Sequence, residues 1–138
     1  MSPRQAADRL FDRAMREAEA GNDEQAAFFA NMGLQAYARV VGPDLDSDAR
    51  LHMGLLALAM ADYERARREA DAMLTEDSRD LFGLLLLIRI AEEQGDQEER
   101  TRQVEALREA VESGTDPDAP QFEAHANLIR QAIGTTGG

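Results

Sequence analysis

Apolar residues recur along this chain at intervals of three and four, which is the spacing of one face of an α-helix. The first such segment follows Ser2, a good helix cap, and Pro3, which suits the first helical position. Gln5 then stands where a capping box needs it. No run alternates apolar and polar residues over the length of a strand. The pattern therefore predicts an all-α fold with about seven helices.

Short turn sequences rich in glycine, asparagine and aspartate separate the predicted helices. Asp46 or Ser47 should cap the third helix, Asp62 the fourth, and Asp96 with Glu99 the sixth. We expect helices at residues 3–20, 23–41, 48–60, 63–75, 79–94, 96–112 and 120–133. Residues 134–138 resemble a flexible linker.

Three of the turns resemble one another. They begin at Gly21, Ala61 and Gly95, so their starts are 40 and 34 residues apart. A turn that recurs at about 34 residues between helices is typical of a solenoid built from helix pairs. Such repeat proteins usually bind other proteins through a curved surface.

The repeats resemble the tetratricopeptide (TPR) family, whose pattern reads W-x2-L-G-x2-Y, then A-x3-F, then P. In the middle repeat these places hold Arg50, Met53, Gly54, Ala57, Ala66, Ala70 and Ser78. In the third they hold Leu84, Leu87, Ile88, Ala91, Arg100 and Val104, and in the first Leu10, Arg13, Ala14, Glu17, Ala26 and Ala30. Arg13, Glu17 and Arg100 depart from the pattern, and its Trp and Pro are absent. A generic antiparallel helical bundle is the alternative.

The resemblance implies a right-handed α-solenoid of antiparallel helix pairs in a single domain, residues 1–133. The three repeats would cover residues 3–41, 47–77 and 79–113, and the helix at 120–133 would cap the last pair. Gly54 lacks a side chain, and we expect it to let the two helices of its pair approach closely.

Composition excludes several kinds of chemistry. The chain has no cysteine, so disulfides, thiolate metal sites and a thiol nucleophile are excluded. It has no lysine either, which excludes a Schiff base and the lysine of a phosphate-binding loop. The net charge of −12 disfavours nucleic acids and anionic membrane surfaces, and weakly favours a basic partner.

No arrangement typical of an active site or metal site is evident. The two histidines, His52 and His125, are 73 residues apart, and neither belongs to a metal-binding pair four residues apart on a helix. His52 lies on an apolar helix, where a hydrogen-bonded structural role is the simplest interpretation. Glycine-rich phosphate loops and a nucleophilic serine elbow are absent. We expect no enzymatic activity, no catalytic residue, no cofactor and no metal.

The predicted third and fifth helices carry more apolar residues than one packing face needs. In TPR domains the first helix of each pair lines the concave groove, so the resemblance implies that this second apolar row binds a partner. The expected contact residues are Phe11, Met15, Leu51, Leu55, Leu58, Phe82, Leu85 and Arg89. Leu55 and Phe82 are the expected anchors. Because these places are mainly apolar, a carboxylate clamp is not expected.

We therefore expect a non-enzymatic interaction module, either an adaptor or scaffold or a small cargo chaperone, that binds an apolar peptide or amphipathic helix. Its size, acidity and three repeats resemble the acidic TPR chaperones of bacterial secretion systems. Two alternatives are a homo-oligomer formed through the Phe28/Phe29 helix and a regulatory domain of a larger protein. The sequence lacks a signal peptide and a membrane-spanning segment, which predicts a cytoplasmic location without membrane insertion.

Overall fold

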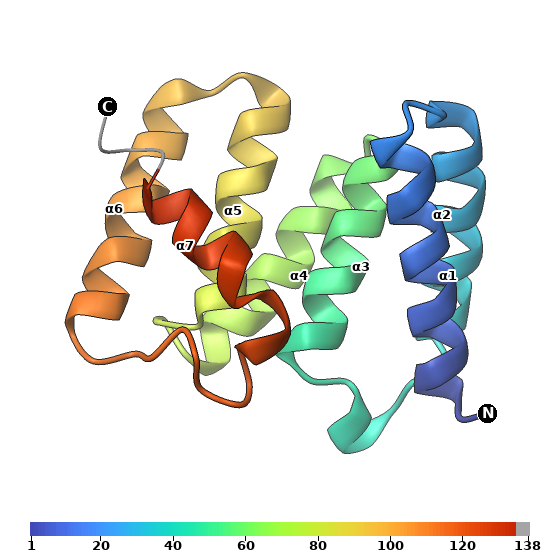
Figure 1. The fold of residues 1–138 in the computed structure, drawn as a ribbon, viewed down its shortest axis with the longest axis horizontal. Helices are drawn as coiled ribbons and strands as arrows, with labels where there is room; N and C mark the ends of the chain where they lie inside the picture. Colours follow the sequence, from blue (N-terminus) through green and yellow to red (C-terminus); the bar gives the residue numbers. More distant parts are fainter. Residues whose placement is uncertain (135–138) are drawn as a thin grey trace. The chain divides into compact units, whose positions relative to one another are not determined.

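The computed structural model describes residues 1–134, and all regular structure in this part of the chain is helical (Figure 1). The α-helices are α1 (Pro3–Glu19), α2 (Asp23–Tyr37), α3 (Ser47–Ala59), α4 (Tyr63–Glu76), α5 (Leu81–Gln94), α6 (Gln97–Glu112) and α7 (Ala126–Gly134). Two short 3-10 helices are η1 (Gly42–Asp44) and η2 (Glu123–His125). The all-α prediction with seven helices is confirmed for the described residues. The predicted linker, apart from Gly134, lies outside them.

The chain divides into two compact units, residues 1–69 and 70–138, with the boundary inside α4. This boundary falls within the second predicted repeat, residues 47–77, and not at a border between repeats. The single domain and the right-handed solenoid stay predictions, and each unit is described by itself.

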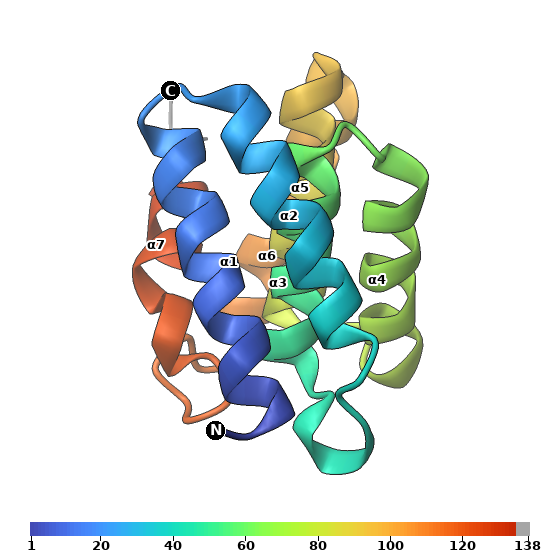
Figure 2. The ribbon, with the colours of Figure 1, turned by 90° about the vertical axis from the view of Figure 1, so that its right-hand side faces the viewer.

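In the first unit, α1 and α2 form an antiparallel pair and both contact α3 (Figure 2). Four alanines of this pair, Ala7, Ala14, Ala26 and Ala30, are buried.

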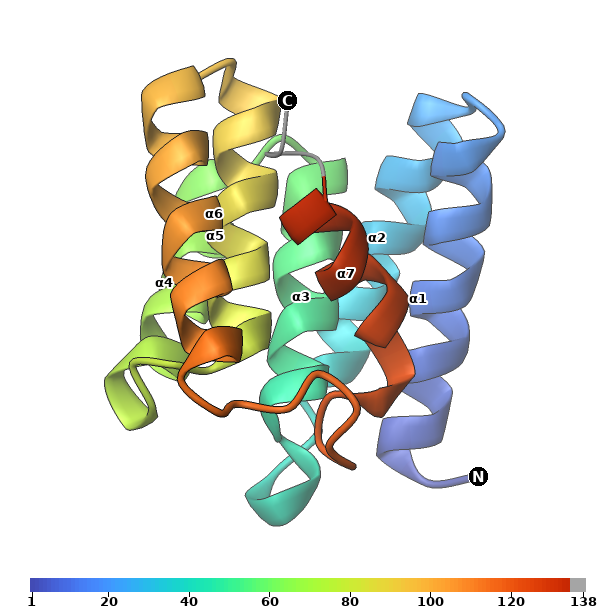
Figure 3. The ribbon, with the colours of Figure 1, turned by 60° about the vertical axis from the view of Figure 1, so that its left-hand side comes forward.

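In the second unit, α5 and α6 lie side by side and α7 contacts both (Figure 3). Ten of the 14 residues of α5 are buried. Apolar side chains therefore project from more than one face of α5, and other segments must pack against more than one face. Asp80 begins α5 by accepting hydrogen bonds from the backbone N–H groups of Phe82 and Gly83, at 2.9 and 3.2 Å. The carboxylate thereby satisfies two donors that the first turn of a helix leaves unpaired.

The three similar turns share one backbone conformation. Gly21, Ala61 and Gly95 have φ angles of 78°, 56° and 69°. In each turn the next residue donates its N–H to a carbonyl five residues earlier, as in a Schellman motif. These bonds, each 2.9 Å, are Asn22 to Glu17, Asp62 to Ala57 and Asp96 to Ala91. The turns join α1 to α2, α3 to α4 and α5 to α6, as predicted.

Most predicted helix starts agree with the structure. Ser2 and Gln5 form the expected capping box. Asp46 caps α3, and the Asp62 and Asp96 carboxylates accept the expected N–H bonds at the starts of α4 and α6. These agreements follow from local chemistry, since a cap involves residues only three positions apart.

Two predicted helix boundaries are wrong. α2 ends at Tyr37 and not at Val41, because the backbone there tightens into bonds three residues apart, including the one from the Val40 N–H to the Tyr37 carbonyl. α7 begins at Ala126 and not at Pro120. The segment before it forms turns and η2, which place the Phe122 side chain in the core of the second unit.

The turn at Ala61 provides a test of stability, because Ala61 is exposed and is the only described residue other than glycine with a positive φ. An L-residue in this conformation costs about 1–2 kcal/mol, and glycine avoids that cost. We expect Ala61→Gly to raise the free energy of unfolding by up to about 1 kcal/mol in urea titrations. The matched change Gly95→Ala should lower it by a similar amount. Loss of stability in Ala61→Gly would contradict this prediction.

Gly83 marks a close helix contact in the second unit. A Cβ atom there would lie 2.8 Å from Leu74 Cγ and 3.3 Å from Met73 Cβ. Overpacking of this kind costs about 1–3 kcal/mol, whereas replacing glycine by alanine inside a helix gains at most about 1 kcal/mol. We therefore expect Gly83→Ala to lower the free energy of unfolding. Gly54 is buried, but its predicted role in close approach stays a prediction.

A double-mutant cycle with Leu74→Ala tests the cause of that loss. If the new methyl group collides with Leu74, Gly83→Ala should cost less, or even stabilise, in the Leu74→Ala background. Equal costs of Gly83→Ala in both backgrounds would show that the collision is not the cause.

Candidate functional site

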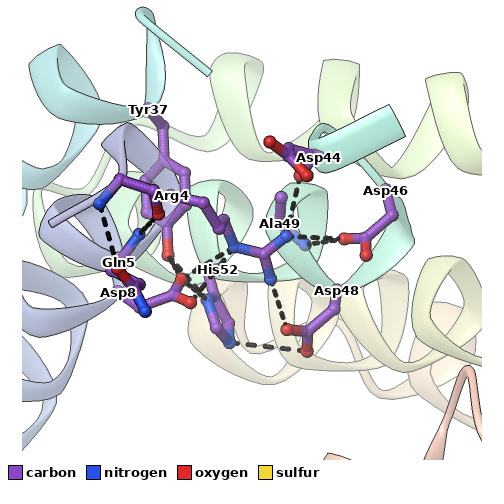
Figure 4. A network of polar contacts seen from close by, with 10 residues as sticks. Arg4, Gln5, Asp8, Tyr37, Asp44, Asp46, Asp48, Ala49 and His52 are labelled. Carbon is purple, nitrogen blue, oxygen red and sulfur yellow. Dashed lines mark hydrogen bonds and ion pairs between the residues drawn. The ribbon is translucent and has the colours of Figure 1, made fainter. Parts of the chain in front are cut away.

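A cluster of polar side chains in the first unit centres on the guanidinium of Arg4 (Figure 4). Its Nε donates to Asp8 Oδ1 at 3.0 Å, one turn further along α1. Its two terminal nitrogens reach the α3 side, where they donate to the Asp44 carbonyl at 2.8 Å, Asp46 Oδ1 at 3.0 Å and Asp48 Oδ2 at 2.6 Å. One arginine thus connects α1 to the segment that begins α3.

Tyr37 and His52 continue this cluster into the unit. The Tyr37 hydroxyl donates to Asp8 Oδ1 at 2.5 Å and lies 2.7 Å from His52 Nδ1. The same Nδ1 also lies 3.2 Å from Asp8 Oδ1, so the hydroxyl, the imidazole and the carboxylate are in mutual contact. The opposite ring nitrogen of His52 lies 3.5 Å from Asp48 Oδ1. Phe11 stacks on the imidazole, with ring centroids 3.8 Å apart.

The environment shifts two pKa values in this cluster. Burial, followed by the hydrogen bond to Asp8 and its charge, raises the pKa of Tyr37 well above its ordinary value. For Arg4, burial alone would lower the pKa, but the hydrogen bond to Asp8 and the charges of Asp46 and Asp8 outweigh it and raise the pKa. Tyr37 is therefore neutral and Arg4 charged at physiological pH.

A tyrosine, a histidine and aspartates in contact could in principle transfer protons. Here Tyr37 is 1% exposed and His52 7%, so a substrate has little access to either group. Within residues 1–134, no buried side-chain nitrogen or oxygen lacks a hydrogen-bond partner. The arrangement fits a structural connection between α1, α2 and α3 better than a reactive centre.

Sequence reasoning missed the role of Arg4. Its helical position predicts the solvent-exposed face of α1, yet its side chain is only 17% exposed because α3 supplies carboxylate partners. The spacing of polar residues along the two helices could have indicated this contact. Arg4 and Asp8 are four residues apart, as are Asp48 and His52, so each helix presents a pair of polar groups on one face.

Five of the predicted partner-binding residues lie in the first unit. Phe11 takes part in the ring stacking described above. Leu51 and Leu55 are buried, while Met15 and Leu58 are half-buried. Little of the surface of Leu55 is therefore open to a partner, contrary to its expected role as an exposed anchor.

The other three predicted residues lie on α5 in the second unit. Phe82 has no exposed surface, because the ring centroids of Phe122 and His125 lie 5.2 and 5.3 Å from its own. The expectation of Phe82 as an open anchor is wrong, since the segment leading into α7 covers it. Leu85 is also buried, whereas the Arg89 side chain is 41% exposed and lies 3.5 Å from Glu92.

A groove of about 540 Å³ lies between α5 and α7. Its apolar lining comes from Leu85 and Ile88, which are buried, and from Leu128 and Ala132, which are half-buried. Its polar residues are Arg89, Glu92, Glu93 and Gln131. Leu85 and Arg89, two of the predicted partner-binding residues, thus line one site. The contribution of α7 to it was missed, because sequence periodicity does not show which helix α7 packs against.

Comparison with known proteins finds no matching family model and no matching curated protein. The TPR resemblance therefore rests on the repeat pattern and stays a prediction. Among the helices of residues 1–134, none combines the length and the apolar character needed to cross a membrane.

Tyr37→Phe tests the buried cluster. The change removes the hydroxyl that Asp8 and His52 share, and leaving buried polar groups unpaired costs about 1–3 kcal/mol. We expect that loss in the free energy of unfolding at pH 7, measured in urea. Tyr63→Phe, at the other tyrosine of the chain, is the matched control and should change stability less.

The pH dependence has a definite sign. The pKa of Tyr37 is higher in the folded state, so its contribution to stability is complete below the unfolded value of about 10 and is lost as the pH rises above it. The stability gap between wild type and Tyr37→Phe should therefore narrow above about pH 10. A gap that stays constant through this range would contradict the assigned role.

Proposed function

We propose that this chain is a non-enzymatic protein-interaction module with a divergent TPR-like repeat arrangement. The repeated left-handed turns at Gly21, Ala61 and Gly95 support the repeats, because all three close a helix with the same hydrogen bonds. The small residues of the repeat pattern also support them. Ala26, Ala30, Ala66 and Ala70 are all buried, as close packing within a helix pair requires.

The observation that carries the proposal is the groove between α5 and α7. Its lining has apolar and polar side chains in equal number, so it suits an amphipathic helix or peptide whose apolar face lies beside charged groups. Apolar contacts there would supply affinity, and Arg89, Glu92 and Glu93 would set orientation.

The packing of α7 supports an apolar partner for this face of α5. α7 is amphipathic, its Ile129 is completely buried, and Phe122 just before it covers Phe82. A partner helix with an apolar face could bind beside α7 in the same manner. Glu92 has two arginine partners, Arg89 at 3.5 Å and Arg100 at 3.1 Å, so the charges around the groove nearly balance, and the preference for a basic partner rests on the net charge of −12. We therefore propose an apolar segment with basic flanking residues, held by an adaptor or a small cargo chaperone.

Leu128 tests the groove, because it lines the site and is only half-buried. The probe is a fluorescein-labelled amphipathic peptide of about 18 residues with leucine on one helical face and arginine on the other. Truncating an anchor in an interface commonly costs about 2 kcal/mol, so Leu128→Ala should weaken binding about 30-fold in fluorescence anisotropy titrations. Glu93→Arg should weaken it less, mainly through the association rate.

Two controls separate groove binding from general attraction to an acidic protein. Leu74→Ala removes another half-buried leucine of the same unit, outside the groove, and should leave the affinity unchanged. A peptide of the same composition, scrambled so that it has no apolar face, should bind at least about tenfold more weakly. Equal binding of both peptides, or unchanged binding to folded Leu128→Ala, would refute the proposal.

A further inference from the structure

One face of α2 exposes large apolar side chains to solvent. Phe28 is 59% exposed and Met32 is 38% exposed, although both lie in the middle of the helix. The neighbouring Phe29 is partly covered, since the guanidinium carbon of Arg13 lies 4.4 Å from its ring centroid. Neighbouring exposed apolar residues on one helix face can form part of an interaction surface.

Helical spacing places five residues of α2 on this face, and Arg39 follows in the turn two residues past the end of the helix; together we call them the α2 stripe. They are Glu24, Phe28, Asn31, Met32, Gln35 and Arg39, and all are exposed. Residues three and four apart lie along one side of a helix, so the stripe runs the whole length of α2. The opposite side carries Ala26, Ala30 and Leu34, which are buried in the first unit.

The two ends of the stripe have opposite charges. Glu24 lies in the first turn of α2 and Arg39 just past its last residue, about 22 Å away at 1.5 Å per residue. Within residues 1–134, neither side chain forms an ion pair. The stripe therefore has uncharged residues, including Phe28 and Met32, between a negative end and a positive end.

We propose that the α2 stripe binds the α2 stripe of a second copy of this chain, with the two helices antiparallel about a two-fold axis near Asn31. A two-fold contact pairs the same surface on both copies. In this arrangement Glu24 of each copy faces Arg39 of the other, and Phe28 of each copy faces the stretch between Met32 and Gln35 of the other stripe. A parallel arrangement would instead place like charges opposite each other.

The expected dimer is weak. Each chain carries a net charge of −12, so two copies repel at long range, and one pair of helices forms a smaller contact than a stable dimer needs. We expect a dissociation constant between about 1 μM and 1 mM. This contact involves residues of the first unit only and does not depend on the proposed peptide groove.

The test is sedimentation equilibrium at about 0.15 M salt, where interactions between distant charges are largely screened. Phe28→Ala should weaken the wild-type dimer at least about tenfold. Glu24→Arg alone and Arg39→Glu alone should each weaken it about tenfold, because each change turns two attractions into repulsions. The double variant Glu24→Arg/Arg39→Glu should restore the dimer, and an equimolar mixture of the two single variants should form a heterodimer.

Each control variant makes the same change in net charge as a stripe variant, but at a residue outside the stripe. Glu98→Arg matches Glu24→Arg, and Arg9→Glu matches Arg39→Glu; both should leave dimerisation unchanged to within about twofold. Thermal melts should confirm that every variant folds. A wild-type chain that stays monomeric at about 1 mM would overturn the proposal, as would a charge-swapped double variant that fails to recover. Single charge variants that dimerise like wild type would also overturn it.

Discussion

Each helix pair in this protein depends on one residue with a positive φ angle. At Gly21, Ala61 and Gly95 the backbone enters the left-handed region, and the following N–H bonds to a carbonyl five residues back. This geometry ends one helix and directs the next one back along it, so that their apolar faces meet. The close packing of the alanines on α1 and α2, and of α5 on α6, follows from this reversal.

Bringing three helices together in the first unit creates a second constraint, because the polar groups that become buried must find partners. In this unit the polar groups find partners in one another, across α1, α2 and α3. The residues involved are Arg4, Asp8, Tyr37, Asp48 and His52. Such a network contributes more to the definition of one arrangement than to net stability, since each group would also be well solvated in the unfolded chain. Its burial sets it apart from the two surfaces that we propose for binding.

Those two surfaces differ in how their apolar residues are covered. On α5, the segment from Phe122 through α7 covers Phe82 and leaves only a groove beside Leu85 and Arg89. On α2, nothing among the described residues covers most of Phe28. A groove with an apolar surface and charged groups suits a foreign helix, whereas a stripe with opposite charges at its two ends is complementary to itself. One chain can therefore present both kinds of contact at separate places.

The sequence by itself determined the helical class, the number of helices and the turns, because these depend on residues a few positions apart. The cap of Ser2 and Gln5, the Asp62 cap and the left-handed Gly95 are examples. Only the tertiary structure decided which of the residues expected at the surface are in fact buried. Arg4 meets Asp48 across 44 positions, and Phe122 covers Phe82 across 40, so neither contact can be read from local spacing. Periodicity shows that a helix face is apolar, but what covers that face depends on which distant segment the folded chain brings against it.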